Sequence, residues 1–334
     1  MFLDRLLGLG VAGAHTTTPP PLSAPPGPSA PIGPPLPPPP TFSWTEWDAH
    51  MSTVIGIVLL TALYLYGITV LRRRNGWAPR TPWGQAALFL SGMVVLFFSL
   101  NGPVHDLSDT FLFSAHMVQH LLLSLAVPPL LLVGTPGWML RPFLKNARVA
   151  AIAGAITRPV RCFIIFNVVI AAWHLPPLYN TAMAHHSVHI VQHLTFLVAS
   201  VLMWWPFLSP LPELPRLAYP GQMLYCFLMV IPMSIVAIYI AMADHVLYPA
   251  YSVAPRVWDI TPMSDQQIGG LIMWVPGGLL FYVVMTFVFF KWAGRDTDTT
   301  AGAQVDWRPA RPTRAPAPSA PPPVTVRHDR SSSY

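Results

Sequence analysis

Charged residues are scarce in this chain. They make up 10% of its 334 residues, while 53% are hydrophobic; a soluble globular domain carries about 25% charged residues. This composition excludes a soluble enzyme or binding domain and indicates a protein whose main partner is the lipid bilayer. The net charge of +6 comes from arginines in short loops and in the C-terminal tail, so we expect no nucleic-acid partner.

Lysine and cysteine are almost absent. Lys145 lies in a loop and Lys291 at the edge of the last hydrophobic run, which excludes a retinal protein, because its Schiff base needs a buried lysine. Cys162 and Cys226 form no CxxC or CxC motif, so neither a disulfide framework nor a thiolate metal site is indicated. No Ser/His/Asp, P-loop or HExxH pattern is present, and we expect the protein not to be an enzyme.

Proline is abundant only in two tails, at about residues 19–40 and 309–323. Such segments are expected to be extended and disordered. We therefore predict a disordered N-terminal segment over 1–48, a transmembrane domain over 49–293 and a disordered cytoplasmic tail over 294–334. Within the first segment, Arg5 precedes a short apolar stretch, and residues 1–14 form a weak signal-peptide pattern.

Long hydrophobic runs account for the rest of the chain. A membrane-spanning helix needs about 20 mostly apolar residues, and seven segments qualify. They predict an all-α, polytopic membrane protein, a seven-helix transmembrane bundle. A kink or an early end is expected at Pro128 and Pro129 in the third segment. The seven segments are approximately 51–71, 84–101, 110–133, 162–176, 187–208, 221–243 and 267–291.

Basic residues between these segments set the predicted orientation. Twelve of them fall in loops on one side of the bundle, and the opposite loops hold only Arg256. Because loops rich in lysine and arginine stay in the cytoplasm, we expect the N-terminus outside and the C-terminus cytoplasmic. The twelve are Arg72, Arg73, Arg74, Arg80, Arg141, Lys145, Arg148, Arg158, Arg161, Arg216, Lys291 and Arg295.

One heptapeptide pattern, S-x-H-x-V-Q-H, occurs twice, from Ser114 and from Ser187. In each copy two histidines stand four residues apart, which places them on one face of a helix. At ~1.5 Å per residue the second histidine of the first copy lies some 15 Å below the start of its span, near the bilayer centre. Imidazoles at that depth are costly without partners, and we interpret the pairs as a functional site on the outer side.

The predicted site is a metal site, because imidazole suits copper, zinc, iron and nickel. Glutamine side chains preceding the second histidine of each pair could orient the rings, and polar residues opening the last span lie at similar depth. Outer methionines, Met117, Met183, Met242 and Met263, could add soft ligands. Taken singly, His50, His105 and His245 are expected to be ordinary interfacial histidines. The candidate ligands are His116, His120, His189, His193, His185, His186 and His174, and the candidate orienting residues are Gln119, Gln192, Asp265 and Gln266.

Four further segments accompany the histidine pairs: HMVQHLLL from His116, PPLLLVGTP from Pro128, WHLPPLY from Trp173 and DQQIGGLIMW from Asp265. Together they resemble the multi-spanning CtaG-type cytochrome c oxidase assembly factors of bacteria, over residues 50–292. The resemblance implies a protein of the bacterial cytoplasmic (inner) membrane that matures haem–copper oxidase. It also implies oxidase subunits as partners, above all the copper-containing ones, and copper as the metal.

Two other functions fit the histidine pairs. A b-type haem electron carrier takes one histidine from each of two helices, and two haems would use all four. A copper transporter would need polar groups continuing to the cytoplasmic side, whereas the spans are apolar below the histidines. An accessory oxidase subunit also remains compatible with the length of the chain.

Overall fold

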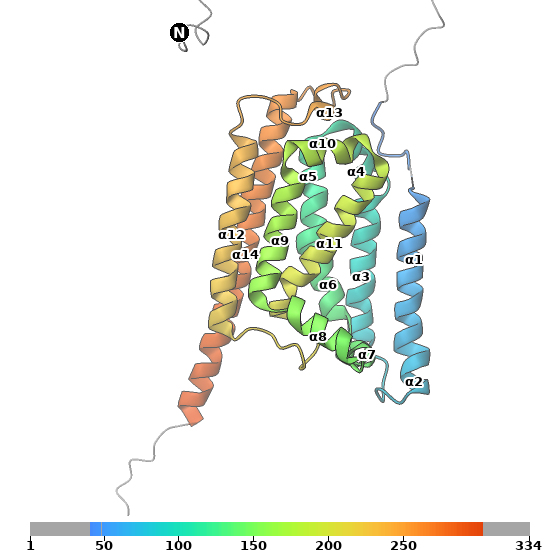
Figure 1. Cartoon of the computed structure of the whole chain (residues 1–334), viewed down its shortest axis with the longest axis vertical. Helices are drawn as coiled ribbons and strands as arrows, with labels where there is room; N and C mark the ends of the chain where they lie inside the picture. The colour runs from blue at the N-terminus through green and yellow to red at the C-terminus, as the bar shows by residue number, and fades with distance from the viewer. Residues whose placement is uncertain (1–40, 48, 303–334) are drawn as a thin grey trace, which may run out of the picture. The chain divides into compact units, whose positions relative to one another are not determined.

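The computed structural model describes residues 41–47 and 49–302. The signal-peptide pattern at 1–14 and both proline-rich stretches lie outside these residues. Every element of regular structure from Phe42 to Gly302 is helical, as Figure 1 shows. The all-α class predicted from the hydrophobic runs is therefore confirmed.

The helices follow one another with short connections. Three π-helical turns interrupt them at Gly67–Leu71, Leu107–Phe111 and Leu122–Ala126. The α-helices are α1 (Met51–Tyr66), α2 (Arg72–Arg74), α3 (Trp83–Leu100), α4 (Pro103–Asp106), α5 (Phe113–Leu121), α6 (Val127–Gly134), α7 (Gly137–Leu144), α8 (Ala147–Ile156), α9 (Pro159–His174), α10 (Pro176–Ala184), α11 (His186–Leu208), α12 (Tyr219–Ala241), α13 (Pro249–Ser252) and α14 (Pro262–Gly302).

Six helical segments are long and apolar enough to cross a membrane, and they coincide with six of the predicted spans. The chain is accordingly a multi-pass membrane protein. The six are Met51–Arg74, Trp83–Leu100, Phe113–Gly134, His186–Leu208, Tyr219–Ala241 and Pro262–Arg295.

The remaining predicted span, 162–176, is α9. This helix has 16 residues, about 24 Å at 1.5 Å per residue, which is shorter than a hydrocarbon core of about 30 Å. It is joined to α8 at a bend of 70°, so the two helices together form either a broken span or a re-entrant loop. The span count is six, or seven when this bent pair is counted as one.

The third span does not end at its prolines. Its helical path continues from α5 through the π-helical turn Leu122–Ala126 into α6. Pro128 has no N–H for the carbonyl of Ser124, four residues earlier. Instead the indole Nε1–H of Trp204, on α11, donates to that carbonyl at 2.9 Å. A side chain from a neighbouring helix thus supplies the missing donor, and the interruption stays inside the helix.

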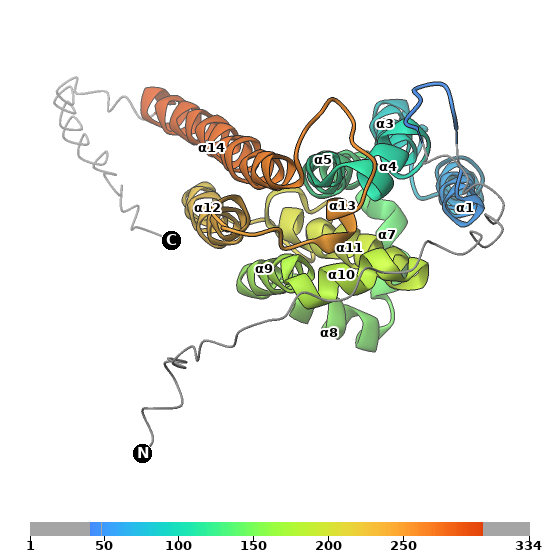
Figure 2. The same ribbon diagram turned by 90° about the horizontal axis from the view of Figure 1, so that it is seen from above.

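Helices α12 and α14 pack closely, and glycine on α14 lets neighbouring helices approach. A Cβ at Gly270 would lie 2.8 Å from the Cβ of Ala241, and one at Gly269 would lie 2.4 Å from the ring of Phe113. The glycine pair therefore permits close approach. Seen from above, α5 lies between α14 and α3, with α11 beside it (Figure 2). The centre of the bundle is apolar and includes Phe196 and Trp204.

The last helix differs from the predicted domain boundary. The tail was placed from residue 294 onward, but α14 continues to Gly302. The predicted boundary relied on the end of the apolar run, whereas a helix can continue beyond it into polar sequence. The rest of the predicted tail lies outside the residues described.

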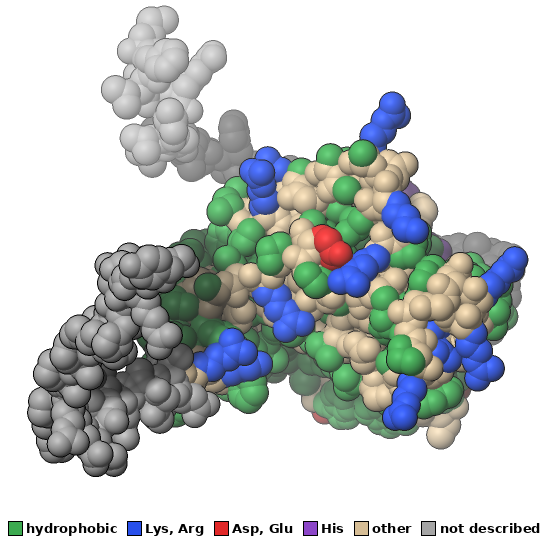
Figure 3. Space-filling view, turned by 90° about the horizontal axis from the view of Figure 1, so that it is seen from below, with side chains coloured by type: hydrophobic (Ala, Val, Ile, Leu, Met, Phe, Trp, Pro, Cys, Tyr) green, Lys and Arg blue, Asp and Glu red, His purple; other side chains and the backbone are tan. Residues whose placement is uncertain are grey.

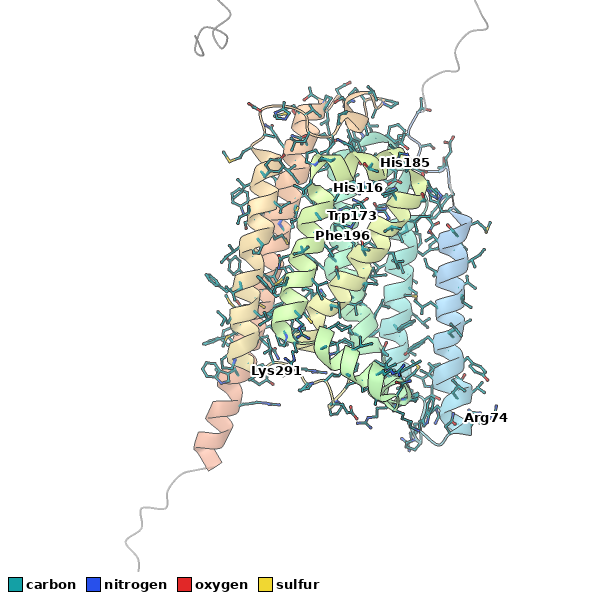
Figure 4. The ribbon with its side chains drawn as sticks, in the orientation of Figure 1. Arg74, His116, Trp173, His185, Phe196 and Lys291 are labelled. Atoms are coloured by element: carbon teal, nitrogen blue, oxygen red, sulfur yellow. The ribbon has the colours of Figure 1, made fainter. Side chains whose placement is uncertain are left out.

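The two ends of the bundle differ in charge. Arg74 and Lys291 lie at one end, whereas His116 and His185 lie towards the other (Figure 4). Lysine and arginine side chains spread over the end that carries α7 and α8 (Figure 3). One of them, Arg141, is paired there with Glu213 at 2.9 Å.

Candidate metal centre

The two histidine pairs meet between α5 and α11. Within each pair the Nε2 atoms are close, 2.8 Å apart for His116 and His120 and 3.1 Å for His189 and His193. Across the pairs, the ring centres of His116 and His189 are 5.4 Å apart, and those of His120 and His193 are 5.6 Å apart. The repeated heptapeptide therefore forms one cluster of four imidazoles, here called the histidine cluster.

Three of these rings could hold one ion. His116, His189 and His193 each offer a nitrogen, and these atoms all lie within 4.8 Å of one another. The cluster is well shielded: His116 is 0% exposed and His189 7%. Imidazoles buried to this degree need polar partners, so their hydrogen bonds decide which nitrogens remain free.

Asp109 is the carboxylate beside the histidine cluster. It is only partly exposed and belongs to the π-helical turn Leu107–Phe111, before α5. Its Oδ2 lies 3.2 Å from Nδ1 of His189, and its Oδ1 lies 3.9 Å from Nδ1 of His116. When Nδ1–H donates to a carboxylate, the lone pair of Nε2 is left to bind a metal. Asp109 thus sets the useful tautomer of His189.

The charge of Asp109 is maintained by its neighbours. Burial alone raises the pKa of this carboxyl, but the hydrogen bond and charge of His189 outweigh that effect. With His105 and His116, these interactions hold the pKa of Asp109 well below its ordinary value. The side chain is therefore a carboxylate near neutral pH.

His105 is not the ordinary interfacial histidine that we expected. It is 5% exposed, and its Nε2 lies 3.4 Å from Asp109. The amide Nε2 of Gln119 lies 2.9 Å from its Nδ1 and also donates to the carbonyl of Ser99 at 2.6 Å. Gln119, predicted to orient a histidine ring, contacts the ring of His105, which in turn lies beside Asp109.

A tyrosine supports the other side of His116. The hydroxyl of Tyr251, on α13, lies 3.2 Å from Nδ1 of His116 and donates to the carbonyl of Ser108 at 2.8 Å. The hydroxyl of Tyr179 lies 3.0 Å from that of Tyr251. Burial raises the pKa of both phenols well above the ordinary value, so both remain neutral. With its proton directed to Ser108, Tyr251 accepts from Nδ1–H of His116, which leaves Nε2 unprotonated and facing Nε2 of His120 at 2.8 Å.

The polar residues that open the last span have another role. Asp265 is 0% exposed, and its carboxylate accepts the backbone N–H groups of Phe113 at 2.6 Å and Ser114 at 3.0 Å. It therefore caps the N-terminus of α5. Gln266 accepts the N–H of Leu247 at 2.7 Å and fixes the loop after α12. The contacts described for these two residues go to backbone groups and not to histidine rings; Asp265 positions the helix that carries two of the rings.

Gln192 is also fully buried. Both its amide oxygen and its amide nitrogen are without a hydrogen-bond partner in the part of the chain described. The structure therefore gives no contact through which it would orient a ring.

The remaining candidate histidines separate into two groups. His174, at the end of α9, is 2% exposed, and its ring centre lies 5.7 Å from that of His120. His185 and His186 are exposed: Nδ1 of His185 lies 3.2 Å from the carbonyl of Thr181, and the ring of His186 lies 5.2 Å from that of His50. The structure thus adds His174 to the cluster and leaves the other two outside it.

Of the four outer methionines, Met117 is the most enclosed, at 1% exposure, whereas Met242 is 77% exposed. Met183 reaches the hydroxyl of Tyr251, with its Sδ 3.8 Å away. Met263 is partly buried. Only Met117 lines the same cavity as a histidine of the cluster.

A cavity of about 200 Å³ lies beside the histidine cluster. Histidines line it, and so do apolar side chains of α1, α3 and α11, such as Ile57, Leu96 and Leu194. Helix α1 is thinly covered, since 17% of its span is buried. The cavity gives the cluster access from the side of the bundle where α1 lies (Figures 1 and 2). The histidines are His50, His105, His186, His189 and His193.

Sequence comparison identifies the family. The model of the cytochrome c oxidase caa3 assembly factors matches residues 62–295, which contain the whole histidine cluster and Asp109. The chain belongs to this family. It is also 27% identical over 280 residues to uncharacterized proteins of Mycobacterium bovis and Mycobacterium tuberculosis, covering 77% of this chain and 41% of each relative. A third uncharacterized protein, of Mycobacterium leprae, is 25% identical over 256 residues, which are 72% of this chain and 38% of that protein.

This caa3 assembly factor homologue thus spans less than half the length of those curated relatives. No solved structure matches the chain.

Proposed function

We propose that this protein binds copper in the histidine cluster and delivers it to copper-containing subunits of cytochrome c oxidase during assembly. We further propose that it does so in the bacterial inner membrane, with the cluster on the periplasmic side. The protein acts as an assembly factor and carries out no catalysis of its own. Copper is its cargo.

The convergence of imidazole nitrogens from α5 and α11 on one point is the observation that carries this proposal. His116, His189 and His193 offer nitrogens within 4.8 Å of one another. Asp109 contacts Nδ1 of His189, and Tyr251 contacts Nδ1 of His116. Carboxylate–imidazole–metal arrangements of this kind are typical of metal sites. Imidazole ligands suit copper, zinc, iron and nickel, and the oxidase family favours copper among them.

The geometry favours copper over haem. A bis-histidine haem would take one histidine from each helix, but the Nε2 atom of every one of these rings already has the Nε2 of its pair partner at 2.8 Å or 3.1 Å. The partner ring would occupy the space that the macrocycle needs around the iron. The cavity of about 200 Å³ beside the cluster is also small for a macrocycle, since drug-sized ligands occupy pockets of about 300–1,000 Å³.

The interior of the bundle favours delivery on one side over transport across the membrane. Beyond the cluster, α9, α11, α12 and α14 bury a core dominated by apolar side chains, such as Phe166, Met229 and Phe281. A transporter would need polar groups along this path. The cavity beside α1 instead provides a lateral approach for a client, which avoids moving a bare cation through hydrocarbon.

Charge supports the proposed orientation. All twelve basic loop residues counted above belong to connections on the side away from the histidines, and that end is rich in lysine and arginine (Figure 3). By the positive-inside rule this end is cytoplasmic. The histidine cluster then lies in the outer half of the membrane.

Metal analysis of the detergent-purified protein tests the proposal. We expect bound copper in the wild-type protein and the loss of the copper held by the cluster in a His116→Ala, His189→Ala variant. His185→Ala is the matched control, because this exposed histidine lies outside the cluster. Unchanged copper stoichiometry in the double variant would contradict the assignment of the cluster.

A further inference from the structure

Two imidazole nitrogens at the inner edge of the histidine cluster lack protein partners within the described residues, and their side chains line one small cavity. They are Nδ1 of His120 and Nε2 of His174, both buried and both without a hydrogen bond within the described residues. The two rings are 4% and 2% exposed, and their centres are 5.7 Å apart. Both side chains line a cavity of about 20 Å³ between α5, α9, α11, α12 and α14.

The tautomer of His174 makes its free nitrogen an acceptor. Nδ1 lies 2.7 Å from the carbonyl oxygen of Ile170; a carbonyl only accepts, so Nδ1 carries the proton. The lone pair of Nε2 therefore points into the cavity. A buried acceptor without a donor is costly, and a positive ion would remove that cost.

Three methionine side chains also line this cavity. Met117 from α5, Met233 from α12 and Met273 from α14 all contribute to it, and they are 1%, 5% and 5% exposed. Gly277 leaves the space for one of them, because a Cβ there would lie 2.0 Å from Cε of Met233. Thioether sulfur is a soft ligand that selects the cuprous ion over harder cations.

We propose that this cavity is a second, inner metal site that takes a cuprous ion through His120, His174 and methionine sulfur. The inference rests on the proposed function in that copper is the cargo, and it adds a site separate from the triad of His116, His189 and His193. His120 joins the two sites, because its Nε2 lies 2.8 Å from that of His116 while its Nδ1 faces the inner cavity. A neutral imidazole has one lone pair, so His120 serves one site at a time.

The rival occupant is water. A cavity of about 20 Å³ can hold one water molecule, which needs about 10–15 Å³, and such a molecule could bridge the two nitrogens. Water and a cuprous ion differ in two ways that can be measured. The ion has sulfur in its first coordination shell, and its binding depends on the methionines.

The test uses the full-length protein in detergent, loaded anaerobically with cuprous ion alone. Bound copper is counted, and X-ray absorption identifies the coordinating atoms. We expect two equivalents in the wild-type protein, with sulfur among the ligands. A His189→Ala, His193→Ala variant should keep one equivalent, now richer in sulfur coordination, and further replacement His174→Ala should remove it.

A second variant preserves the volume of the cavity. Met233→Leu with Met273→Leu should lose the inner equivalent and the sulfur signal, whereas Met203→Leu should lose neither, because this buried methionine of α11 does not line the cavity. If copper binds without sulfur ligands and both His174→Ala and the double leucine variant keep full stoichiometry, the inner site is wrong and the cavity holds water. That result leaves the outer cluster intact as a proposal. Absence of any bound copper in the wild-type protein overturns both.

Discussion

The carboxylate Oδ2 of Asp109 lies 3.2 Å from Nδ1 of His189, although the two residues belong to segments far apart in the chain. The same carboxylate reaches His105 at 3.4 Å and His116 at 3.9 Å. One negative charge thus sits beside three imidazoles from α4, α5 and α11. This arrangement partly offsets the positive charge that a bound metal would bring to the membrane interior.

The first prediction concerns copper affinity. Asp109→Asn keeps the size of the side chain but removes the charge that fixes the tautomer of His189. Because partners of this kind typically contribute 10–100-fold to metal affinity, we expect a loss of about that size in a copper competition assay. Asp244→Asn, an exposed carboxylate away from the cluster, is the control. Equal affinities for both variants and the wild-type protein would show that Asp109 does not support the site.

The second prediction concerns pH. The pKa of Asp109 in the folded protein lies below the ordinary value of 3.8, so folding favours the ionised form. This contribution to stability is fully present above the unfolded pKa and is lost as the pH falls through the folded pKa. The difference in Tm between wild type and Asp109→Asn should be largest above about pH 5 and shrink below about pH 4. A difference that grows on acidification would refute the argument.

The third prediction concerns the cap of α5. Asp265→Asn places an amide NH2 where two backbone N–H groups now donate to a carboxylate. The loss of a cap and the burial of unsatisfied donors should cost about 2 kcal/mol of unfolding free energy. Thermal unfolding in detergent measures this effect as a lower Tm. Gln267→Ala, at an exposed neighbouring position, should leave Tm close to that of the wild-type protein.

The fourth prediction concerns orientation. A reporter fused after Arg295 should read cytoplasmic, and reporters inserted after His105 or His185 should read periplasmic, because the basic loops lie at the opposite end from the histidines. A periplasmic signal from the Arg295 fusion would place the cluster on the wrong side for the proposed role.

The fifth prediction concerns the cell. Deletion of this protein should leave the oxidase subunits made but poorly active, with less copper in the membranes. His120→Ala should reproduce the deletion, whereas Cys162→Ser with Cys226→Ser should not, because both thiols are buried in apolar surroundings. Oxidase turnover and copper content measured in membranes from these strains decide the matter. Full oxidase activity with His116 and His120 both replaced would show that the histidine pairs serve structural packing and not oxidase assembly.

Much of this fold follows from the sequence. Six spans could be predicted because each is a long apolar run, which has few alternatives to a membrane helix. The bend between α8 and α9 was missed, since Ala147–Ile156 is only 10 residues long and composition does not reveal a bend. The continuation of the helix past Pro128 was not predicted either, because the donor that replaces its missing N–H comes from Trp204, on another helix.

The candidate site was predictable in part. The repeated heptapeptide shows that His116, His120, His189 and His193 share helix faces, but nothing in the sequence places Asp109 between them. The one available signal was the spacing of His105 and Asp109, four residues apart as in the histidine pairs. Asp265 was selected for its predicted depth, and its hydrogen bonds go to the start of α5. Depth can be predicted from a span, whereas the direction of a side chain needs the packed structure.

The hydrogen bond between Trp204 and the carbonyl of Ser124 has a mechanical consequence. It ties α11 to the helix formed by α5 and α6 below the cluster, while Asp109 links α11 to the segment before α5 above it. The two histidine-bearing helices are thus fastened by polar bonds at both ends of the site. Separating them would leave the carbonyl of Ser124 unsatisfied in the membrane interior, where no water replaces the lost donor, and would part Asp109 from His189. The protein therefore fixes the spacing of the ligands before any ion binds. Copper would have to enter and leave on the side of α1, the span that is thinly covered.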